Sequence, residues 1–307
     1  MIISASRRTD IPAYYSEWFF NRIREGIVHV RNPMNARQIS KINLSPDVVD
    51  CIVFWSKNPK PMLDKLSFMK DYHYYFQFTL NSYSDDIETK LPPGSKIIET
   101  FLRLAEQIGP RRVIWRYDPI LLNNKYTIAY HINRFGETAR KLKGYTEKVI
   151  FSFIDFYKKI DNNIKYLNVR DITVDEKNTI AENLSNIAKN NGFQIDTCAE
   201  GIDLSKYGIS HARCIDDRLI SKITGYNLEA AKDKNQRLEC GCIAGIDIGA
   251  YNSCQNGCLY CYANYSQNIV EKNALKHNPL SLLLIGEDDS NDIFNLPPRQ
   301  SSIFLLS

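Results

Sequence analysis

The sequence has no strong charge of one sign and no long apolar run. Its 39 lysines and arginines against 35 aspartates and glutamates leave a formal net charge of +4, which permits an anionic partner but does not support nucleic acid as that partner. No apolar segment approaches the about 20 residues that span a membrane, and the opening stretch MIISASRRTD lacks the apolar centre of a secretory signal. We therefore expect a cytoplasmic protein without a membrane partner.

Histidine is also scarce. The five histidines follow no metal-ligand spacing, although His211 stands three residues before Cys214 and could replace a cysteine as a ligand. Cysteine is more abundant, with eight copies. Because thiols stay reduced in the cytosol, these cysteines are expected to bind metal rather than to form disulfides.

Five of the eight cysteines lie within residues 240–264, and three of them have a regular spacing. Cys254, Cys258 and Cys261 form the pattern C-x3-C-x2-C, with Tyr260 just before the last. Thiolates this close can hold a zinc ion or the irons of a cluster. A structural zinc or an electron-transfer cubane normally takes four ligands, whereas three thiolates on a 4Fe–4S cubane leave one iron open. Gly257 would let the backbone fold tightly at this point.

The loop YNSCQNGCLYCYAN at residues 251–264 resembles two groups of known proteins. Its cysteine pattern is similar to the C-x3-C-x-aromatic-C signature of the radical S-adenosylmethionine (SAM) enzymes, and the loop as a whole looks like that of the spore photoproduct lyase group. The chain also resembles an uncharacterised microbial family, the domain of unknown function numbered 1848. That likeness runs from SASRRTDIPAY at 4–14, through WSKNP at 55–59 and RYDPI at 116–120, to the cysteine loop.

This resemblance implies a radical-SAM-like iron–sulfur enzyme. Cys254, Cys258 and Cys261 would hold a 4Fe–4S cluster with Tyr260 packed against it, and the open iron would bind SAM. One electron, from a donor such as a flavodoxin or ferredoxin, would cleave SAM to methionine and a 5′-deoxyadenosyl radical, which takes a hydrogen atom from a substrate. The resemblance does not indicate whether that substrate is a small molecule or a macromolecule.

Four further cysteines stand at an expected strand end or in polar loops: Cys198, Cys214, Cys240 and Cys242. Four is the ligand count of a complete site, which predicts a second 4Fe–4S cluster or a tetrahedral zinc ion. The spacing C-x-C at 240–242 is shorter than the usual C-x2-C of zinc knuckles and favours a cluster. The alternative is that these are scattered buried thiols. Cys51 lies in an apolar run and is expected in the core.

The first two thirds of the chain alternate short apolar runs with helical stretches, which is typical of parallel βαβ units. Helices are expected near 13–25, 60–69, 95–108, 126–142 and 175–190, and another at 265–277 after the cysteine loop. The segment 33–49 shows little helical pattern. Seven strands are expected at Ile2–Ser6, Ile27–Val30, Asp50–Trp55, Tyr74–Leu80, Arg112–Tyr117, Lys148–Phe153 and Gln194–Thr197.

Seven strands do not close a TIM-like (β/α)8 barrel, and Ile246–Ile248 is the candidate for the eighth. In most radical-SAM barrels the cluster loop follows the first strand, whereas here it would follow the last. We therefore predict a circularly permuted barrel in which Ile246–Ile248 pairs beside Ile2–Ser6. The chain 1–307 would form one domain, with a cysteine-rich part at 198–264 and an irregular tail at 287–307.

Strand alternation places polar residues on the inner face of this barrel. Alternate residues of two predicted strands face the lumen, and these include Gln77, Asn81, Arg116 and Asp118. Branched apolar side chains would fill a purely structural lumen, so these residues predict a polar ligand cavity, unless they only cap the strand ends.

Arg7 and Arg8 follow the first strand, and active sites of such barrels lie where strands end. With Asn81, Arg116 and Asp118 they are candidates for binding SAM or an anionic substrate, although any single arginine can make a structural ion pair. No Gly-Gly-Glu motif, which many radical-SAM enzymes use for the SAM amino group, follows the first two strands.

Two other functions remain open at this stage. A non-catalytic iron–sulfur redox protein or sensor would need the cluster without SAM. A zinc-stabilised nucleic-acid-binding or repair-related protein is suggested by the likeness to a lyase loop, but the small charge argues against it.

Overall fold

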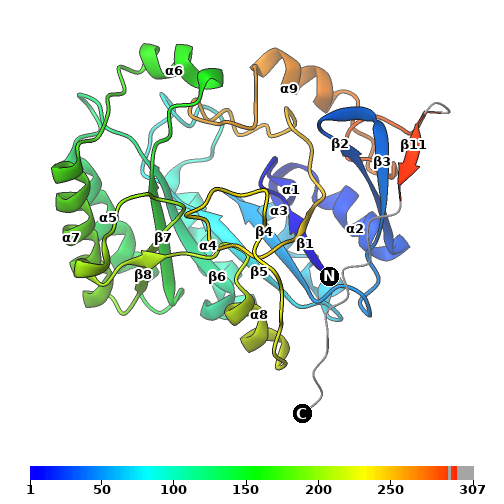
Figure 1. Cartoon of the computed structure of the whole chain (residues 1–307), viewed down its shortest axis with the longest axis horizontal. Helices are drawn as coiled ribbons and strands as arrows, with labels where there is room; N and C mark the ends of the chain where they lie inside the picture. Colours follow the sequence, from blue (N-terminus) through cyan, green and yellow to red (C-terminus); the bar gives the residue numbers. More distant parts are fainter. Residues whose placement is uncertain (290–291, 296–307) are drawn as a thin grey trace.

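The computed structural model describes residues 1–289 and 292–295 and shows an α/β fold built on one eight-stranded sheet (Figure 1). Every neighbouring pair in this sheet is parallel, as expected where crossover connections join the strands. The strand order is β10-β1-β4-β5-β6-β7-β8-β9. The strands are β1 (Ile2–Ala5), β4 (Cys51–Ser56), β5 (Tyr74–Thr79), β6 (Val113–Ile120), β7 (Lys148–Phe153), β8 (Gln194–Thr197), β9 (Ser210–His211) and β10 (Ile246–Asp247).

The strand before the cysteine loop pairs with the first strand of the chain, which confirms that part of the prediction. β10 runs parallel to β1, with Ile246 opposite Ile3 and Asp247 opposite Ser4. Because the two strands point the same way, the cysteine loop leaves the sheet at the edge where residues 6–10 also leave it.

One carboxylate joins these two strands. Asp247 accepts hydrogen bonds from the hydroxyls of Ser4 (2.8 Å) and Ser6 (2.6 Å). It also accepts from the backbone N–H groups of Arg7 (2.8 Å) and Gly249 (2.9 Å). A Cβ atom on Gly249 would lie 2.1 Å from the Ser6 hydroxyl, so only glycine allows the chain to turn this close to β1.

The strand predicted at Ile27–Val30 is present, but its predicted place in the main sheet is wrong, because it belongs to a second sheet. β2 (Ile27–Asn32) pairs antiparallel with β3 (Asn35–Asn43), and β11 (Ile293–Asn295) adds to β3. Figure 1 shows these three strands together at one end of the molecule. Residues 33–34, between β2 and β3, form a hairpin turn, so no crossover connection leads from this strand to the main sheet.

The main sheet has eight strands because β9 joins it in place of the strand predicted at Ile27–Val30. β9 was not predicted from the sequence because this strand has only two residues. Within 1–289 and 292–295, no pairing joins β9 to β10, so closure of the barrel is not shown. The predicted irregular tail at 287–307 contains β11, while residues 290–291 and 296–307 lie outside the described residues.

Helices cover one face of the main sheet, and strand alternation places the residues as predicted. Phe76 and Phe78 of β5 and Trp115 of β6 pack beneath α4 (Gly94–Ile108), α5 (Ile128–Leu142) and neighbouring helices. Trp115 stacks on Phe135 with 4.6 Å between the ring centres.

None of the described helices has both the length and the apolar character needed to cross a bilayer. The helices are α1 (Ile11–Tyr14), α2 (Ser16–Glu25), α3 (Lys60–Leu63), α4 (Gly94–Ile108), α5 (Ile128–Leu142), α6 (Asp161–Tyr166), α7 (Val174–Asn190), α8 (Asp217–Thr224) and α9 (Gln267–Ala274).

Part of the other face is covered by residues 212–245, the segment that connects β9 to β10. Figure 1 shows this yellow stretch crossing the sheet. Its apolar residues, among them Ile215 and Ile243, form a second buried cluster with inward-facing residues such as Val53, Tyr75 and Ile114. The segment therefore fills one end of the inner face, and the polar residues near the strand ends stay open to a cavity.

Replacing Asp247 with alanine should destabilise the fold, because four donors lose their shared acceptor. Each such bond contributes about 1 kcal/mol and more when the acceptor is charged, so we expect a loss of about 2–4 kcal/mol in urea unfolding of the metal-free chain. Asp64→Ala is the control, because Asp64 is 86% exposed and makes one 3.4 Å ion pair with Arg103. An equal effect of both substitutions would contradict the role given to Asp247.

Candidate active site

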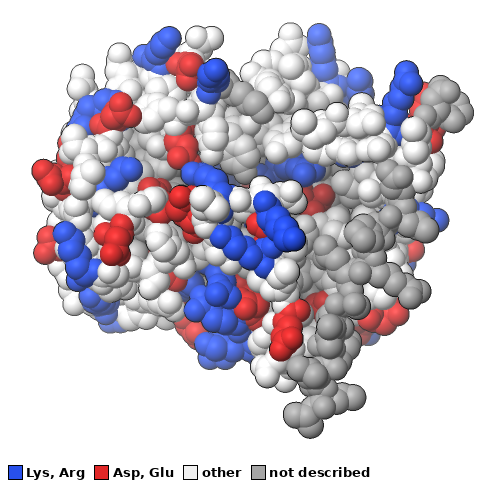
Figure 2. Space-filling view, viewed as in Figure 1, with Lys and Arg blue, Asp and Glu red and all other residues white. Residues whose placement is uncertain are grey.

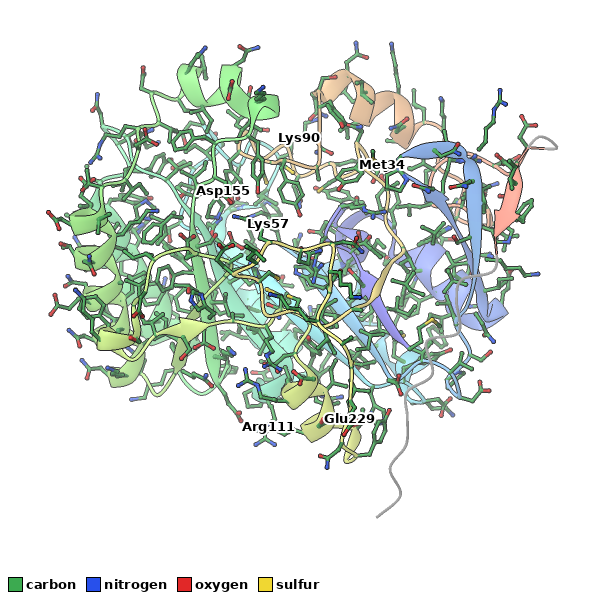
Figure 3. The ribbon with its side chains drawn as sticks, viewed as in Figure 1. Met34, Lys57, Lys90, Arg111, Asp155 and Glu229 are labelled. Atoms are coloured by element: carbon green, nitrogen blue, oxygen red, sulfur yellow. The ribbon has the colours of Figure 1, made fainter. Side chains whose placement is uncertain are left out.

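A cavity of about 660 Å³ opens at the carboxyl ends of the strands, where active sites of parallel α/β sheets form. Residues that follow β1, β4, β7 and β8 contribute to its wall, together with residues 116–119 of β6, residues 233–247 and the cysteine loop. Both cysteine groups reach this wall: Cys198, Cys214, Cys240 and Cys242 on one part, and Cys254 and Cys261 on another. In Figure 3, Lys57 and Asp155, which also line the cavity, lie near the middle of the molecule.

The cysteine loop is folded tightly against residues 88–90. Gly257 has a φ of +67°, in the region that favours glycine. Glu88 forms an isolated antiparallel bridge with Cys258, and the Thr89 hydroxyl donates to the Gly257 carbonyl at 3.0 Å. The Cys261 N–H donates to the Cys258 carbonyl at 3.1 Å, which makes a turn and brings these two cysteines close.

The N-terminal segment holds the same loop from the other side. Tyr15 donates to the Ser253 carbonyl at 2.6 Å, and Tyr14 donates to the Asn256 side chain at 2.9 Å. Asn256 in turn donates to the buried carboxylate of Asp10 at 3.0 Å. Asp10 also accepts from the Lys57 backbone N–H at 2.8 Å, so the motifs SASRRTDIPAY and WSKNP meet at the cysteine loop.

Burial governs the acidity of the three loop cysteines. It raises the pKa of Cys254 to about 12 and the pKa of Cys258 well above its usual value, although the Lys57 ammonium opposes the shift at Cys258. Burial also raises the pKa of Cys261. The thiols of the metal-free chain are therefore protonated near neutral pH, and a bound metal must displace these protons.

A buried ion pair stands beside the loop. Lys57 Nζ lies 2.7 Å from Glu88 Oε1 and 5.5 Å from the centre of the Tyr260 ring. Burial alone would lower the pKa of Lys57, but Glu88 and Cys258 raise it, so the side chain stays charged. Tyr260, predicted to pack against the cluster, lines the cavity, and its hydroxyl donates to Glu88.

Asn81 and Asp118 are held by the protein itself. The Asn81 amide donates to Glu88 (3.1 Å), to the Asp118 carbonyl (2.9 Å) and to the Tyr260 hydroxyl (3.0 Å), and its oxygen accepts from the Asp118 N–H at 2.8 Å. Asn81 is not among the residues that line the cavity. Its contacts position Tyr260 and Glu88, whereas Asp118 reaches the cavity wall.

Arg7, Arg8 and Arg116 all line the cavity. The Arg116 guanidinium pairs with Asp118 and donates to the Cys214 sulfur at 2.8 Å. Burial alone would lower the pKa of Arg116, but Cys214 and Asp118 raise it well above its usual value. Arg116 therefore faces the second cysteine group.

The guanidinium groups of Arg7 and Arg8 lie over aromatic rings at the cavity wall. Arg7 is 5.3 Å from the centre of the Trp55 ring, and Arg8 is 5.2 Å from that of Tyr251. Arg7 Nη2 is buried without a hydrogen-bond partner. The hydroxyl of Thr9, which also lines the cavity, is a second buried polar group without a partner, and such groups are uncommon in folded proteins.

The second cysteine group is assembled from separate segments. The sulfurs of Cys198 and Cys214 are 3.5 Å apart, and the Cys214 N–H donates to the Cys242 sulfur at 3.1 Å. A hydrogen bond with Cys242 lowers the pKa of Cys240 to about 7. The four cysteines predicted as a set are thus brought together, and Cys51 lies in the core, fully buried.

No group of three or more His, Cys, Asp or Glu side chains in the described part of the chain is already arranged to hold a metal ion. The ligands of a cubane bind different irons and need not converge on one point. Sequence reasoning did not assign roles to Glu88 and Asn256, because each stands in a polar stretch that is typical of an exposed loop.

Acidic and basic side chains alternate over the face of the molecule that Figure 2 presents. Lysines and arginines gather about its middle, but acidic residues lie among them, so this face carries no continuous basic stripe. A nucleic-acid-binding surface would be expected to have one.

Comparison with known proteins gives one family. Residues 2–263 match the model of a family described as Domain of unknown function (DUF1848). The matched range contains both cysteine groups and every residue proposed above to support them. No curated protein matches the chain significantly.

Gly257→Ala should displace the cysteine loop and reduce iron binding after anaerobic reconstitution. The new Cβ atom would lie 2.3 Å from the Thr89 hydroxyl and 3.1 Å from Lys90 Cγ. A left-handed backbone also costs a non-glycine residue roughly 1–2 kcal/mol. The control is Gly286→Ala, which has a φ of +77° with no atom within 4 Å and so adds only the backbone cost. Equal iron content in the two variants would contradict the role given to Gly257.

Proposed function

The chain belongs to the family described as Domain of unknown function (DUF1848), and we propose that it is a radical-SAM-like iron–sulfur enzyme. In this proposal Cys254, Cys258 and Cys261 hold one 4Fe–4S cluster, and the protein cleaves SAM reductively to start radical chemistry on a substrate. The observation that carries the proposal is the position of the three-cysteine loop, two of whose cysteines line a cavity of about 660 Å³ at the strand ends.

The residues of the loop fit such a cluster. Three thiols stand on one short loop, and the turn from Cys258 to Cys261 brings two of them close. When bound, the cluster supplies an open iron for the amino and carboxylate groups of SAM and the electron that breaks its carbon–sulfur bond. The Ala263 N–H lies 3.4 Å from the Cys261 sulfur, a contact that stabilises a thiolate ligand.

The wall of the cavity has the chemistry that SAM requires. A volume of about 660 Å³ falls within the range of roughly 300–1,000 Å³ for small-molecule sites. The aromatic rings of Trp55, Tyr251 and Tyr262 offer surfaces for an adenine. Arg7 and Arg8, which line the cavity, offer positive charge for a carboxylate.

The chain's own residues would orient the ligand and exclude water. Asp10, Asn256 and the two tyrosines at 14 and 15 fix the loop relative to β1, so the cluster and the cavity keep one geometry. A flavodoxin or ferredoxin is the expected electron donor. The non-catalytic redox protein, which keeps the cluster but leaves SAM intact, is the alternative that the following measurement separates.

Cys258→Ala should abolish the formation of 5′-deoxyadenosine from SAM by the reconstituted, reduced protein. Loss of one of three thiolates leaves the cluster open to iron loss, so the iron content should fall as well. Cys51→Ala is the control, because Cys51 is buried in the core beneath Tyr75 and Val53. If the wild-type protein binds its cluster but neither binds nor cleaves SAM, the enzyme proposal fails.

The Lys57–Glu88 pair should tune the reduction potential of the cluster. Reduction adds negative charge, so removing the cation in Lys57→Met should lower the midpoint potential, and removing the anion in Glu88→Gln should raise it. Potentiometric titration followed by electron paramagnetic resonance measures both shifts. Lys90→Met is the control, since Lys90 is 44% exposed and its charge is screened. Shifts of the same sign in the two pair variants would contradict this role.

A further inference from the structure

The second cysteine group brings together four cysteines from separate parts of the chain. Cys198 stands directly after β8, Cys214 follows β9, and Cys240 and Cys242 flank Gly241 before β10. The sulfurs of Cys198 and Cys214 are 3.5 Å apart, the Cys214 backbone N–H donates to the Cys242 sulfur at 3.1 Å, and Cys242 hydrogen-bonds Cys240. Three of the four side chains are almost fully buried, with Cys240 at 6% the most exposed of them. Scattered buried thiols would not be expected to make these contacts with one another.

The spacing of the sulfurs distinguishes one metal ion from a cluster. Zinc–sulfur bonds of about 2.3 Å in a tetrahedron place neighbouring sulfurs about 3.8 Å apart. The thiolates of a cubane bind different irons and stand farther apart. The 3.5 Å between the sulfurs of Cys198 and Cys214 is close to the edge of the tetrahedron.

A close contact at Gly241 explains why the spacing C-x-C occurs here. A Cβ atom on Gly241 would lie 2.9 Å from Arg213 Cγ and 3.3 Å from the Ala212 carbonyl oxygen. The backbone at 240–242 therefore packs against residues 212–213, and this contact sets the position of Cys240 and Cys242. The short spacing favoured a cluster in the sequence, but this contact accounts for it without one.

Two arginines supply the charge that such a site needs. Four thiolates around a divalent ion carry a net charge of −2, which a buried site must balance. Arg116 is 5% exposed and donates to the Cys214 sulfur at 2.8 Å. The Arg7 guanidinium interacts electrostatically with Cys242, Cys214 and Cys240, and its Nη2 is the buried donor without a partner. Thiolate sulfurs would satisfy it.

We propose that Cys198, Cys214, Cys240 and Cys242 bind one Zn²⁺ ion as a tetrahedral thiolate site. In the described residues the four side chains do not yet surround one point, and the ion draws them together. The site fastens the segment 212–245 to the end of β8 and so fixes one wall of the cavity. Its existence does not depend on the cluster of the three-cysteine loop.

The test is metal analysis of the full-length protein purified without oxygen. We expect about one zinc per chain beside the cluster iron, retained when air has destroyed the cluster. Cys214→Ser should lose the zinc and keep the iron, whereas Cys258→Ala should lose the iron and keep the zinc. Substitution of Co²⁺ into the wild-type protein should give the visible absorption bands of a tetrahedral thiolate site, which tests the site even if Cys214→Ser does not fold.

Three results would overturn the proposal. One is protein without zinc but with about four additional irons, the content of a second cubane. Another is a single additional iron in place of zinc. The third is a chain that binds neither zinc nor Co²⁺ at these cysteines. Failure of SAM cleavage with the zinc present would count against the proposed function alone.

Discussion

The parallel pairing of β10 with β1 is the constraint on which the site depends. These strands come from opposite ends of the chain, and their alignment puts the cysteine loop beside residues 6–10. Asp247 fixes the alignment of the two strands through four hydrogen bonds. The hydrogen bond from Asn256 to Asp10 then holds the cysteine loop against the segment that follows β1. The pairing therefore sets where the three cysteines lie relative to the ends of the other strands.

Two cysteine groups share one cavity, and different charged residues lie beside each group. Lys57 and Glu88 stand beside the three-cysteine loop, whereas Arg116 and Arg7 face the group of four. Thiolates are anionic ligands, so each buried group needs cations nearby. The distribution of lysine and arginine over the cavity wall is what two separate metal–thiolate sites would require.

Most strands of the main sheet could be predicted from the sequence because their apolar runs are regular, and the neighbour of β1 could be predicted by counting strands. The strand at Ile27–Val30 was predicted in the wrong sheet, since an apolar run does not show which sheet a strand joins. β9 was not predicted, because a strand of two residues leaves no pattern. The cysteines were identifiable from their spacing and number. The Lys57–Glu88 pair was not, because a buried pair between residues 31 apart arises only when the chain folds. Arg116 was correctly given the inner face, but its partner, Cys214, lies 98 residues away.

The most direct test of the account is the electron paramagnetic resonance spectrum of the reduced, reconstituted protein with and without SAM. Three thiolate ligands leave one iron open, so binding of the SAM amino and carboxylate groups should change the g values of the cluster signal. The same addition to a cluster with four protein ligands should change nothing. A signal of one 4Fe–4S cluster that shifts with SAM is the result we predict, and a signal that stays the same at saturating SAM would contradict the account.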